Sequence, residues 1–204
     1  MFRHGTPRVW GRILLILLGG SAFTLPAFSS PALGQESLET PKAVIFADSA
    51  VDLQEMERRL KFSPAANVTQ QYFAHPIPVS GSQHPRLAAK IDGILQRVCA
   101  VLRLWPKNGP PLRIFLLKDG QEVRKRYLAF HPLEEKPLFG LFGYSHLEGF
   151  YEARSNAIFL SLADLHEGIL AHEMTHAVLC TALAAPPAEH LQEEWARYVE
   201  TRLN

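Results

Sequence analysis

Hydrophobic residues between Pro85 and Leu104 recur at intervals of three and four, which is the spacing of an amphipathic α-helix. The same spacing predicts a helix from Asp52 to about Leu60, and further helices over residues 121–130, 164–181 and 188–202. Apolar, β-prone runs predict strands at residues 43–47 and 112–117. The polar residues 35–41 indicate a loose leader, and residues 62–83 and 131–149 have the composition of loops.

A β-hairpin is predicted just ahead of the fourth helix. Gly149-Phe150-Tyr151 and Ala157-Ile158-Phe159-Leu160 are apolar runs, and Ala153-Arg154-Ser155-Asn156 between them is typical of a turn. Asp164 is expected to cap the following helix, because Glu167 stands three residues later, as in a capping box.

The first 34 residues have the composition of an export signal. Arg3, Arg8 and Arg12 precede the apolar residues 13–28, and Ala32-Leu33-Gly34 has the small-x-small form that signal peptidase accepts. The apolar run is short for a membrane span and contains a proline, so cleavage before Gln35 is expected, with an uncleaved membrane anchor as the alternative. Residues 35–204 are then long enough for one domain with its own core.

Charge and cysteine content limit the partners and the compartment. Residues 1–34 contain three basic residues and no acidic ones, so the remaining chain has 18 Lys and Arg against 20 Asp and Glu, a formal charge of −2. This near-neutral balance argues against nucleic acid as a partner. Cys99 and Cys180 both fall on predicted helices. In an oxidising compartment they could form a disulfide, and otherwise they would be buried free thiols; their spacing does not decide between the two.

The sequence His172-Glu173-Met174-Thr175-His176 has the form H-E-x-x-H and lies on the predicted helix over residues 164–181. Residues four apart lie on one face of a helix, so both imidazoles can reach one metal ion. Glu173 lies near that face and can hold the water that the metal polarises. Zinc is expected, because imidazole and carboxylate ligands with an open fourth position suit it. The structural alternative is a buried helix with two incidental histidines.

The last predicted helix offers a third ligand, and here the chain resembles the gluzincins, the peptidase MA-like group of zinc peptidases. In that family a helix after H-E-x-x-H carries a ligand glutamate in a pattern like E-G-x-A-x-Y-x-E. Glu193, Ala196, Tyr198 and Glu200 match this pattern, so the resemblance implies Glu193 as the third ligand. Glu194 stands where the family has glycine, which leaves a shift of the ligand to Glu194 open. The alternative to a ligand role for Glu193 is that it belongs to a solvated acidic face of a terminal helix.

The resemblance also implies a fold and a place for the substrate. The fold would be α+β and zincin-like: a small mixed sheet with a backing helix, the H-E-x-x-H helix and a following glutamate-ligand helix. In this family the substrate peptide pairs with an edge strand ahead of the zinc helix. That implies substrate binding by Ala157, Ile158, Phe159 and Leu160, unless these residues simply form a core hairpin.

The implied activity is hydrolysis of peptide bonds through a water activated by one Zn²⁺ ion, with Glu173 as the general base. The substrate would be a protein or peptide met after export, in the periplasm or cell envelope or outside the cell. A membrane contact is expected only through an uncleaved N-terminal segment. Gluzincins usually add a tyrosine or histidine that donates to the oxyanion. The eligible residues here are Tyr144, Tyr151, Tyr198, His146 and His190.

Two other hypotheses stand beside the peptidase. The chain stops at Asn204, four residues after Glu200, whereas most gluzincins continue into a lower subdomain. The resemblance therefore implies a minimal peptidase, with a shallow cleft or with a cleft completed by a partner protein. A second hypothesis is a metal-binding, weakly active or inactive zincin-fold module for binding or assembly in the cell envelope. A third is an exported structural domain with a fortuitous motif. The intact Glu173 favours the peptidase, because a binding module has no reason to keep a general base.

Overall fold

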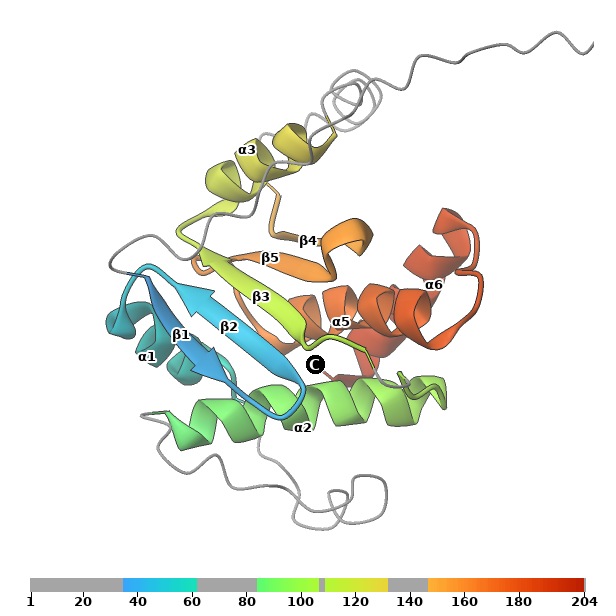
Figure 1. The fold of residues 1–204 in the computed structure, drawn as a ribbon, viewed down its shortest axis with the longest axis horizontal. Helices are drawn as coiled ribbons and strands as arrows, with labels where there is room; N and C mark the ends of the chain where they lie inside the picture. The colour runs from blue at the N-terminus through green and yellow to red at the C-terminus, as the bar shows by residue number, and fades with distance from the viewer. Residues whose placement is uncertain (1–34, 62–83, 107–108, 132–146, 204) are drawn as a thin grey trace, which may run out of the picture. The chain divides into compact units, whose positions relative to one another are not determined.

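A computed structural model describes residues 35–61, 84–106, 109–131 and 147–203, all within the unit Pro31–Asn204 (Figure 1). The predictions for residues 1–34, for the loop at 62–83 and for residues 132–146 lie outside these ranges. In the described residues, five strands form one mixed sheet in the order β1-β2-β3-β5-β4. The strands are β1 (Glu36–Glu39), β2 (Ala43–Ala47), β3 (Leu112–Leu117), β4 (Gly149–Glu152) and β5 (Ala157–Ser161). β2, β3 and β5 run parallel, and β1 and β4 pair antiparallel at the two edges.

Five α-helices accompany the sheet in the described part of the chain. They are α1 (Ala50–Arg59), α2 (Pro85–Leu102), α3 (Gly120–Phe130), α5 (Glu167–Ala182) and α6 (Glu189–Leu203). Every helix expected from the hydrophobic spacing is present, with ends that differ from the expected ones by at most three residues. The expected α+β class is therefore confirmed. None of the helices in the described ranges combines the length and the apolarity that a membrane crossing requires.

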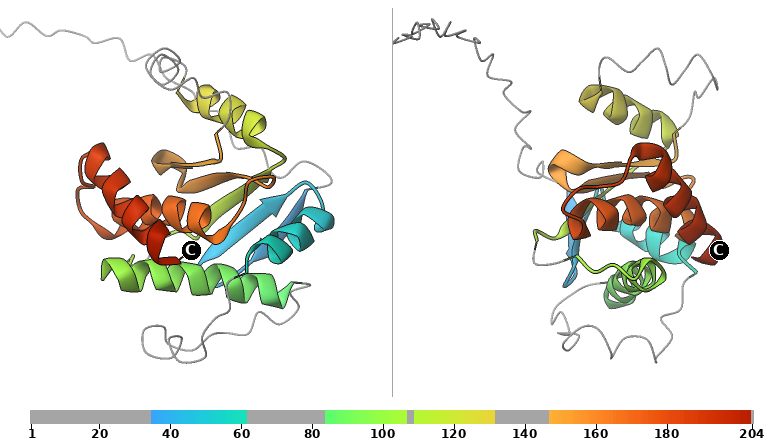
Figure 2. Two further views of the ribbon diagram at one scale, coloured as in Figure 1. Left: turned by 180° about the vertical axis from the view of Figure 1, so that it is seen from behind. Right: turned by 90° about the vertical axis from the view of Figure 1, so that its right-hand side faces the viewer.

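One face of the sheet is covered by α1, α2 and α5 (Figures 1 and 2). Ile45 of β2 and Ile114 of β3 are fully buried there. All three helices pack on these strands through buried apolar side chains, which include the stripe predicted for α2. The residues are Leu53, Met56, Leu87, Ile91, Leu95, Val98, Leu102, Leu170 and Met174. This layer supplies most of the core. Complete burial of one such side chain stabilises the fold by about 1.5–3 kcal/mol.

Four phenylalanines stack across the opposite face of the sheet, which α3 covers over β3, β5 and β4. Phe46, Phe115, Phe159 and Phe150 occupy paired positions on β2, β3, β5 and β4. Their ring centroids are 4.8, 5.0 and 4.8 Å apart in that order, with the rings nearly parallel. Phe130 of α3 packs on Phe159 at 5.5 Å. We call this row the phenylalanine ladder; it fixes the register of four strands on one face.

The N-terminal stretch 35–41 is not the loose leader that its polar composition indicated. Residues 36–39 form β1, which pairs antiparallel with β2. Leu38 is buried in the core, and the turn into β2 is closed by Thr40, whose hydroxyl accepts a hydrogen bond from the Ala43 amide at 2.9 Å. The same hydroxyl donates to Asp92 of α2 at 2.7 Å. A four-residue edge strand needs only one inward apolar side chain, which is too weak a pattern to find in sequence.

The start of α5 also differs from the expectation that Asp164 caps it. The Asp164 carboxylate accepts instead from the Ser161 hydroxyl, within a turn closed by a hydrogen bond from the Asp164 amide to the Ser161 carbonyl. The helix begins three residues later than predicted, and its N-cap is His166, whose Nδ1 accepts from the Gly168 amide at 3.1 Å. The expected capping box is therefore wrong.

The strand expected to bind substrate at an edge of the sheet is not at an edge. β5 is hydrogen-bonded to β3 on one side and to β4 on the other, so the backbone of residues 157–160 is already paired. Ala157, Ile158, Phe159 and Leu160 are all buried. The edge strand of the hairpin is β4, so the expectation that residues 157–160 offer a free strand edge to a substrate peptide is wrong.

Candidate metal centre

The candidate metal centre is built on one face of α5. This helix is almost completely buried, because it lies between the sheet, α2 and α6 (Figure 2). Between Gly168 and Cys180 every residue except His172, His176 and Cys180 is buried. These three residues are four apart and share one face. The rings of His172 and His176 lie 5.2 Å apart, so the spacing of the H-E-x-x-H motif places both imidazoles side by side, as expected.

Glu193 of α6 reaches both histidines. One carboxylate oxygen lies 3.5 Å from Nε2 of His172, and the other lies 3.3 Å from Nε2 of His176. One potential ligand atom from each of the three residues lies within 4.8 Å of the other two. The structure thus brings together the three residues expected to bind metal. Glu194, the alternative third ligand, is exposed and lines a hollow beside α2 instead.

The distances within this group fit a shared metal ion. Two ligand atoms at about 2.0–2.1 Å from one tetrahedral ion are about 3.3–3.4 Å apart. The separation between the histidine nitrogen and the nearer Glu193 oxygen is 3.5 Å for His172 and 3.3 Å, to the other oxygen, for His176, and both are close to that value. His172, His176 and Glu193 could therefore hold a divalent metal ion.

Two further side chains of α6 hold the outer nitrogens of the histidine rings. Nδ1 of His172 lies 3.2 Å from a Glu200 oxygen, and Nδ1 of His176 lies 3.4 Å from Oε1 of Gln192. Gln192 in turn donates from Nε2 to the Pro187 carbonyl at 2.8 Å. A partner at Nδ1 favours the tautomer that leaves Nε2 free as a ligand. In the sequence Glu200 stands out only as a match to the family pattern, and nothing marks Gln192.

His172, His176 and Glu193 shift one another's pKa values. Burial alone would lower the pKa of His172, but Glu193, Glu173 and Glu200 outweigh it and raise that pKa to about 9. The pKa of His176 is also raised, because Glu193 and Glu173 outweigh its burial. Hydrogen bonds from His172 and His176 hold the pKa of Glu193 well below its usual range. A metal bound at Nε2 must displace protons from both rings, so binding would release protons at neutral pH.

Glu173 is the buried carboxylate next to this group. Only 8% of its surface is exposed, and burial raises its pKa, while the neighbouring charges of His176 and His172 partly oppose that rise. Gly149, the first residue of β4, lies against it. A Cβ atom at Gly149 would stand 3.3 Å from Cγ of Glu173 and 3.0 Å from Cδ2 of Leu160. Because Gly149 has no side chain, β4 can lie close to α5 at this point.

The other residues singled out in the sequence are not part of the group formed by His172, His176 and Glu193. Tyr151 donates its hydroxyl to Oδ1 of Asn156 at 3.1 Å, and its burial raises its pKa. Tyr198 and His190 are exposed on α6, and Tyr144 and His146 lie outside the described residues. Cys99 and Cys180 are both free thiols; Cys180 lies 3.8 Å from Oε1 of Gln192.

No protein-family model, curated protein or solved structure matches this chain. The family resemblance therefore stays an expectation from sequence. The chemical capacity of the site lies in its side chains: two imidazoles and one carboxylate that could hold a metal ion, and a buried carboxylate beside them.

Proposed function

We propose that this protein is a zinc-dependent peptidase in which His172, His176 and Glu193 bind the metal and Glu173 is the general base. The observation that carries the proposal is the position of Glu173, a buried carboxylate beside the three-residue group. Burying a carboxylate costs free energy. A site that only stores metal gains nothing from such a group, whereas a hydrolytic site needs a base whose pKa is raised toward neutrality.

Zinc is the proposed metal because of the number and kind of the ligands. Two imidazoles and one carboxylate are a usual set for catalytic zinc and leave one coordination position for water. When bound, the ion would lower the pKa of that water and polarise the scissile carbonyl group. Glu200 and Gln192 support this assignment, since histidine ligands of zinc usually have such a partner at the second ring nitrogen.

Glu173 would move the protons of the reaction. Its carboxylate would accept a proton from the attacking water and then donate it to the nitrogen of the departing amine. The first transfer requires an ionised carboxylate, and the positive charges of His172 and His176, or of a metal in their place, favour that form.

The substrate would add to the sheet at β4. In the described part of the chain no strand pairs with the outer side of β4, and Gly149 at its start lies against Glu173. An extended peptide on this edge would form backbone hydrogen bonds that do not depend on its side chains, and its backbone would pass close to the base. We further propose that this substrate is met after export, on the sequence of residues 1–34 alone.

The test compares the full-length protein with Glu173→Gln and with Glu189→Gln, a matched change at an exposed position of α6. Zinc content is measured by elemental analysis, and cleavage with casein and a peptide library. We expect about one zinc ion per chain in all three proteins. Glu173→Gln should lower the cleavage rate by about 10²–10⁴-fold, and Glu189→Gln should leave it unchanged.

Two results would contradict the peptidase proposal. Equal cleavage by wild type and Glu173→Gln would mean that Glu173 is not the base or that the activity belongs to a contaminant. Zinc in the wild type without cleavage of any substrate would leave the metal-binding module as the remaining hypothesis. Absence of zinc, together with an unaltered fold in His172→Ala, would refute the metal centre itself.

A further inference from the structure

The outward face of α6 carries an apolar stripe that no described element covers. Leu191, Trp195 and Tyr198 are 40%, 45% and 45% exposed, and among the described residues the only other exposed large hydrophobic side chain is Val51. With Arg202 these residues follow one another at intervals of four, three and four, which is the seam spacing of paired helices. Glu193 and Glu200 lie on the opposite face, toward α5.

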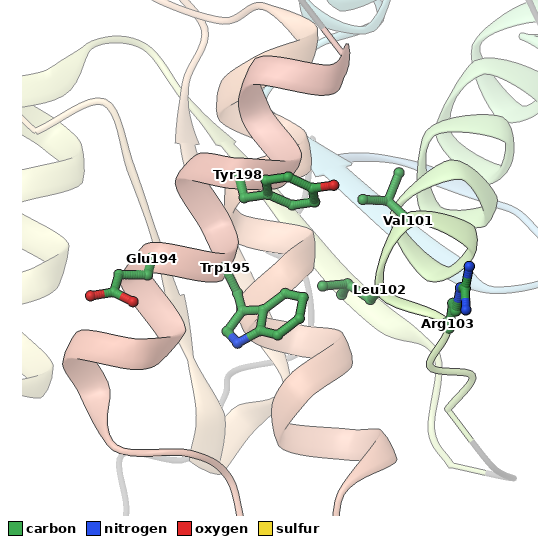
Figure 3. A pocket seen from close by; sticks show the side chains of 6 residues that line it. All are labelled: Val101, Leu102, Arg103, Glu194, Trp195 and Tyr198. Carbon is green, nitrogen blue, oxygen red and sulfur yellow. The ribbon is translucent and has the colours of Figure 1, made fainter.

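The stripe borders an open hollow at the end of α2 (Figure 3). Trp195 and Tyr198 contact each other edge to face at 6.4 Å, and both point toward Val101 and Leu102. Arg103, the C-cap of α2, closes one side. Exposed tryptophan and tyrosine beside a hollow are typical of the centre of a protein–protein interface.

The exposed charges on α6 are divided between its two halves. The first half presents the carboxylates of Glu189 and Glu194 and no lysine or arginine. The second half presents the guanidinium groups of Arg197 and Arg202, and its only carboxylate, Glu200, is half-buried against His172. A partner helix with the same division of charge would therefore fit in the antiparallel direction and would be repelled in the parallel one.

We propose that this face binds a second copy of the chain, with the two α6 helices antiparallel about a two-fold axis. A two-fold axis places the same surface on both sides of the contact, so Glu194 of each chain faces the Arg197 and Arg202 end of the other. The two Trp195–Tyr198 pairs meet at the centre and fill the hollows beside α2. The acidic half of the helix disfavours the alternative of an anionic membrane surface.

The first test measures the oligomeric state of the full-length protein by sedimentation velocity between about 1 μM and 0.1 mM. We expect a monomer–dimer equilibrium in the wild type. Trp195→Ala and Tyr198→Ala should each raise the dimer dissociation constant about tenfold or more. Val51→Ala removes an even more exposed apolar side chain, on α1, and should leave the dissociation constant unchanged. Circular dichroism confirms that each variant is folded.

The second test exchanges the charges. Glu194→Arg should weaken the dimer, and the variant with Glu194→Arg, Arg197→Glu and Arg202→Glu together should restore it, because antiparallel helices then regain opposite charges. A wild type that is monomeric at 0.1 mM overturns the proposal, as does a dimer that Trp195→Ala leaves intact. A monomer whose binding to anionic vesicles is lost in Trp195→Ala overturns it in favour of a membrane surface.

Discussion

At the scale of single residues, His172 and His176 differ in the group that holds their Nδ1 atoms. His172 meets the carboxylate of Glu200, and His176 meets the amide oxygen of Gln192. The orientation of that amide is set by Pro187, whose carbonyl accepts from Nε2 of Gln192. The loop between α5 and α6 is thereby connected to His176, a candidate metal ligand, through a single side chain. A carboxylate makes an imidazole a stronger ligand than an amide does, so His172 should bind metal more strongly than His176.

Loss of either partner should weaken metal binding. We expect Gln192→Leu and Glu200→Leu each to reduce zinc affinity about 10–100-fold, because the imidazole then loses its fixed tautomer and orientation. Competition with a chromophoric chelator measures the affinity. Gln192→Glu keeps an acceptor at the same place and should retain most of it. Thr201→Ala, at an exposed position beside Glu200, is the control. Wild-type affinity in both leucine variants would show that the two contacts are incidental.

The grouping of His172, His176 and Glu193 could be predicted from sequence, but the partners of the two histidines could not. His172 and His176 are fixed relative to each other by one helix, and Glu193 stands out through the pattern it shares with Ala196, Tyr198 and Glu200. The Nδ1 contacts depend on how closely α5 and α6 pack, which the sequence does not state. A signal was present all the same: Glu200 follows Glu193 by seven residues, two helical turns, and so lies on the same face.

At the scale of elements, the start of α5 shows why helix boundaries are hard to predict. Asp164 and Glu167 have the spacing of a capping box, yet Ser161 satisfies the Asp164 carboxylate within a preceding turn. His166 takes the capping position with Nδ1, and histidine is not among the usual N-cap residues. The local competition between a turn and a cap is decided by hydrogen bonds that leave no periodic pattern.

Removal of this cap should destabilise the protein. We expect His166→Ala to lower the free energy of unfolding by about 1 kcal/mol, because the Gly168 amide loses its acceptor, and His166→Asn to restore most of it. Urea denaturation followed by circular dichroism measures the change. His190→Ala, at an exposed position in the first turn of α6, is the control. If His166→Ala were as stable as the wild type, the hydrogen bond at Nδ1 would contribute nothing.

The hairpin was predictable, whereas its position in the sheet was only weakly marked. β5 reads Ala-Ile-Phe-Leu, a continuous apolar run, and such runs are typical of strands covered on both faces inside a sheet. β4 reads Gly-Phe-Tyr-Glu and alternates in burial, as a strand at an edge can. That difference already pointed to β4 as the edge. The pairing of β5 with β3, about forty residues earlier, decided it.

At the scale of the whole molecule, α6 is held to the rest of the protein by a few apolar side chains and by the polar contacts of the candidate metal centre. Its buried residues are Ala196 and Val199, which are small, and its neighbours are α5 and α2. Three of its polar side chains reach the histidines of α5. The negative charge of Glu193 and Glu200 beside Glu173 makes this contact repulsive once the histidines lose their protons, unless a cation takes their place.

Removal of metal should therefore loosen α6 before the sheet. Zinc at about 1,000 times its dissociation constant stabilises the form that binds it by about 4 kcal/mol. We expect a chelator to speed amide hydrogen exchange in α6 and in the second half of α5, with little change in β2, β3 and β5. Hydrogen–deuterium exchange followed by mass spectrometry measures this, with His172→Ala as a control that should no longer respond to the chelator. Uniform exchange across all elements, with and without metal, would contradict it.

The phenylalanine ladder bears on the order in which the chain folds. Phe46 and Phe150 belong to one row of rings but are more than a hundred residues apart in sequence. Only the step between β4 and β5 is local; the other two require closure of long loops, which is slow. Because α5 follows β5 and packs behind it, the helix with the histidines has no fixed place until β5 has joined β3. We therefore expect the metal centre to be among the last parts of the native state to appear.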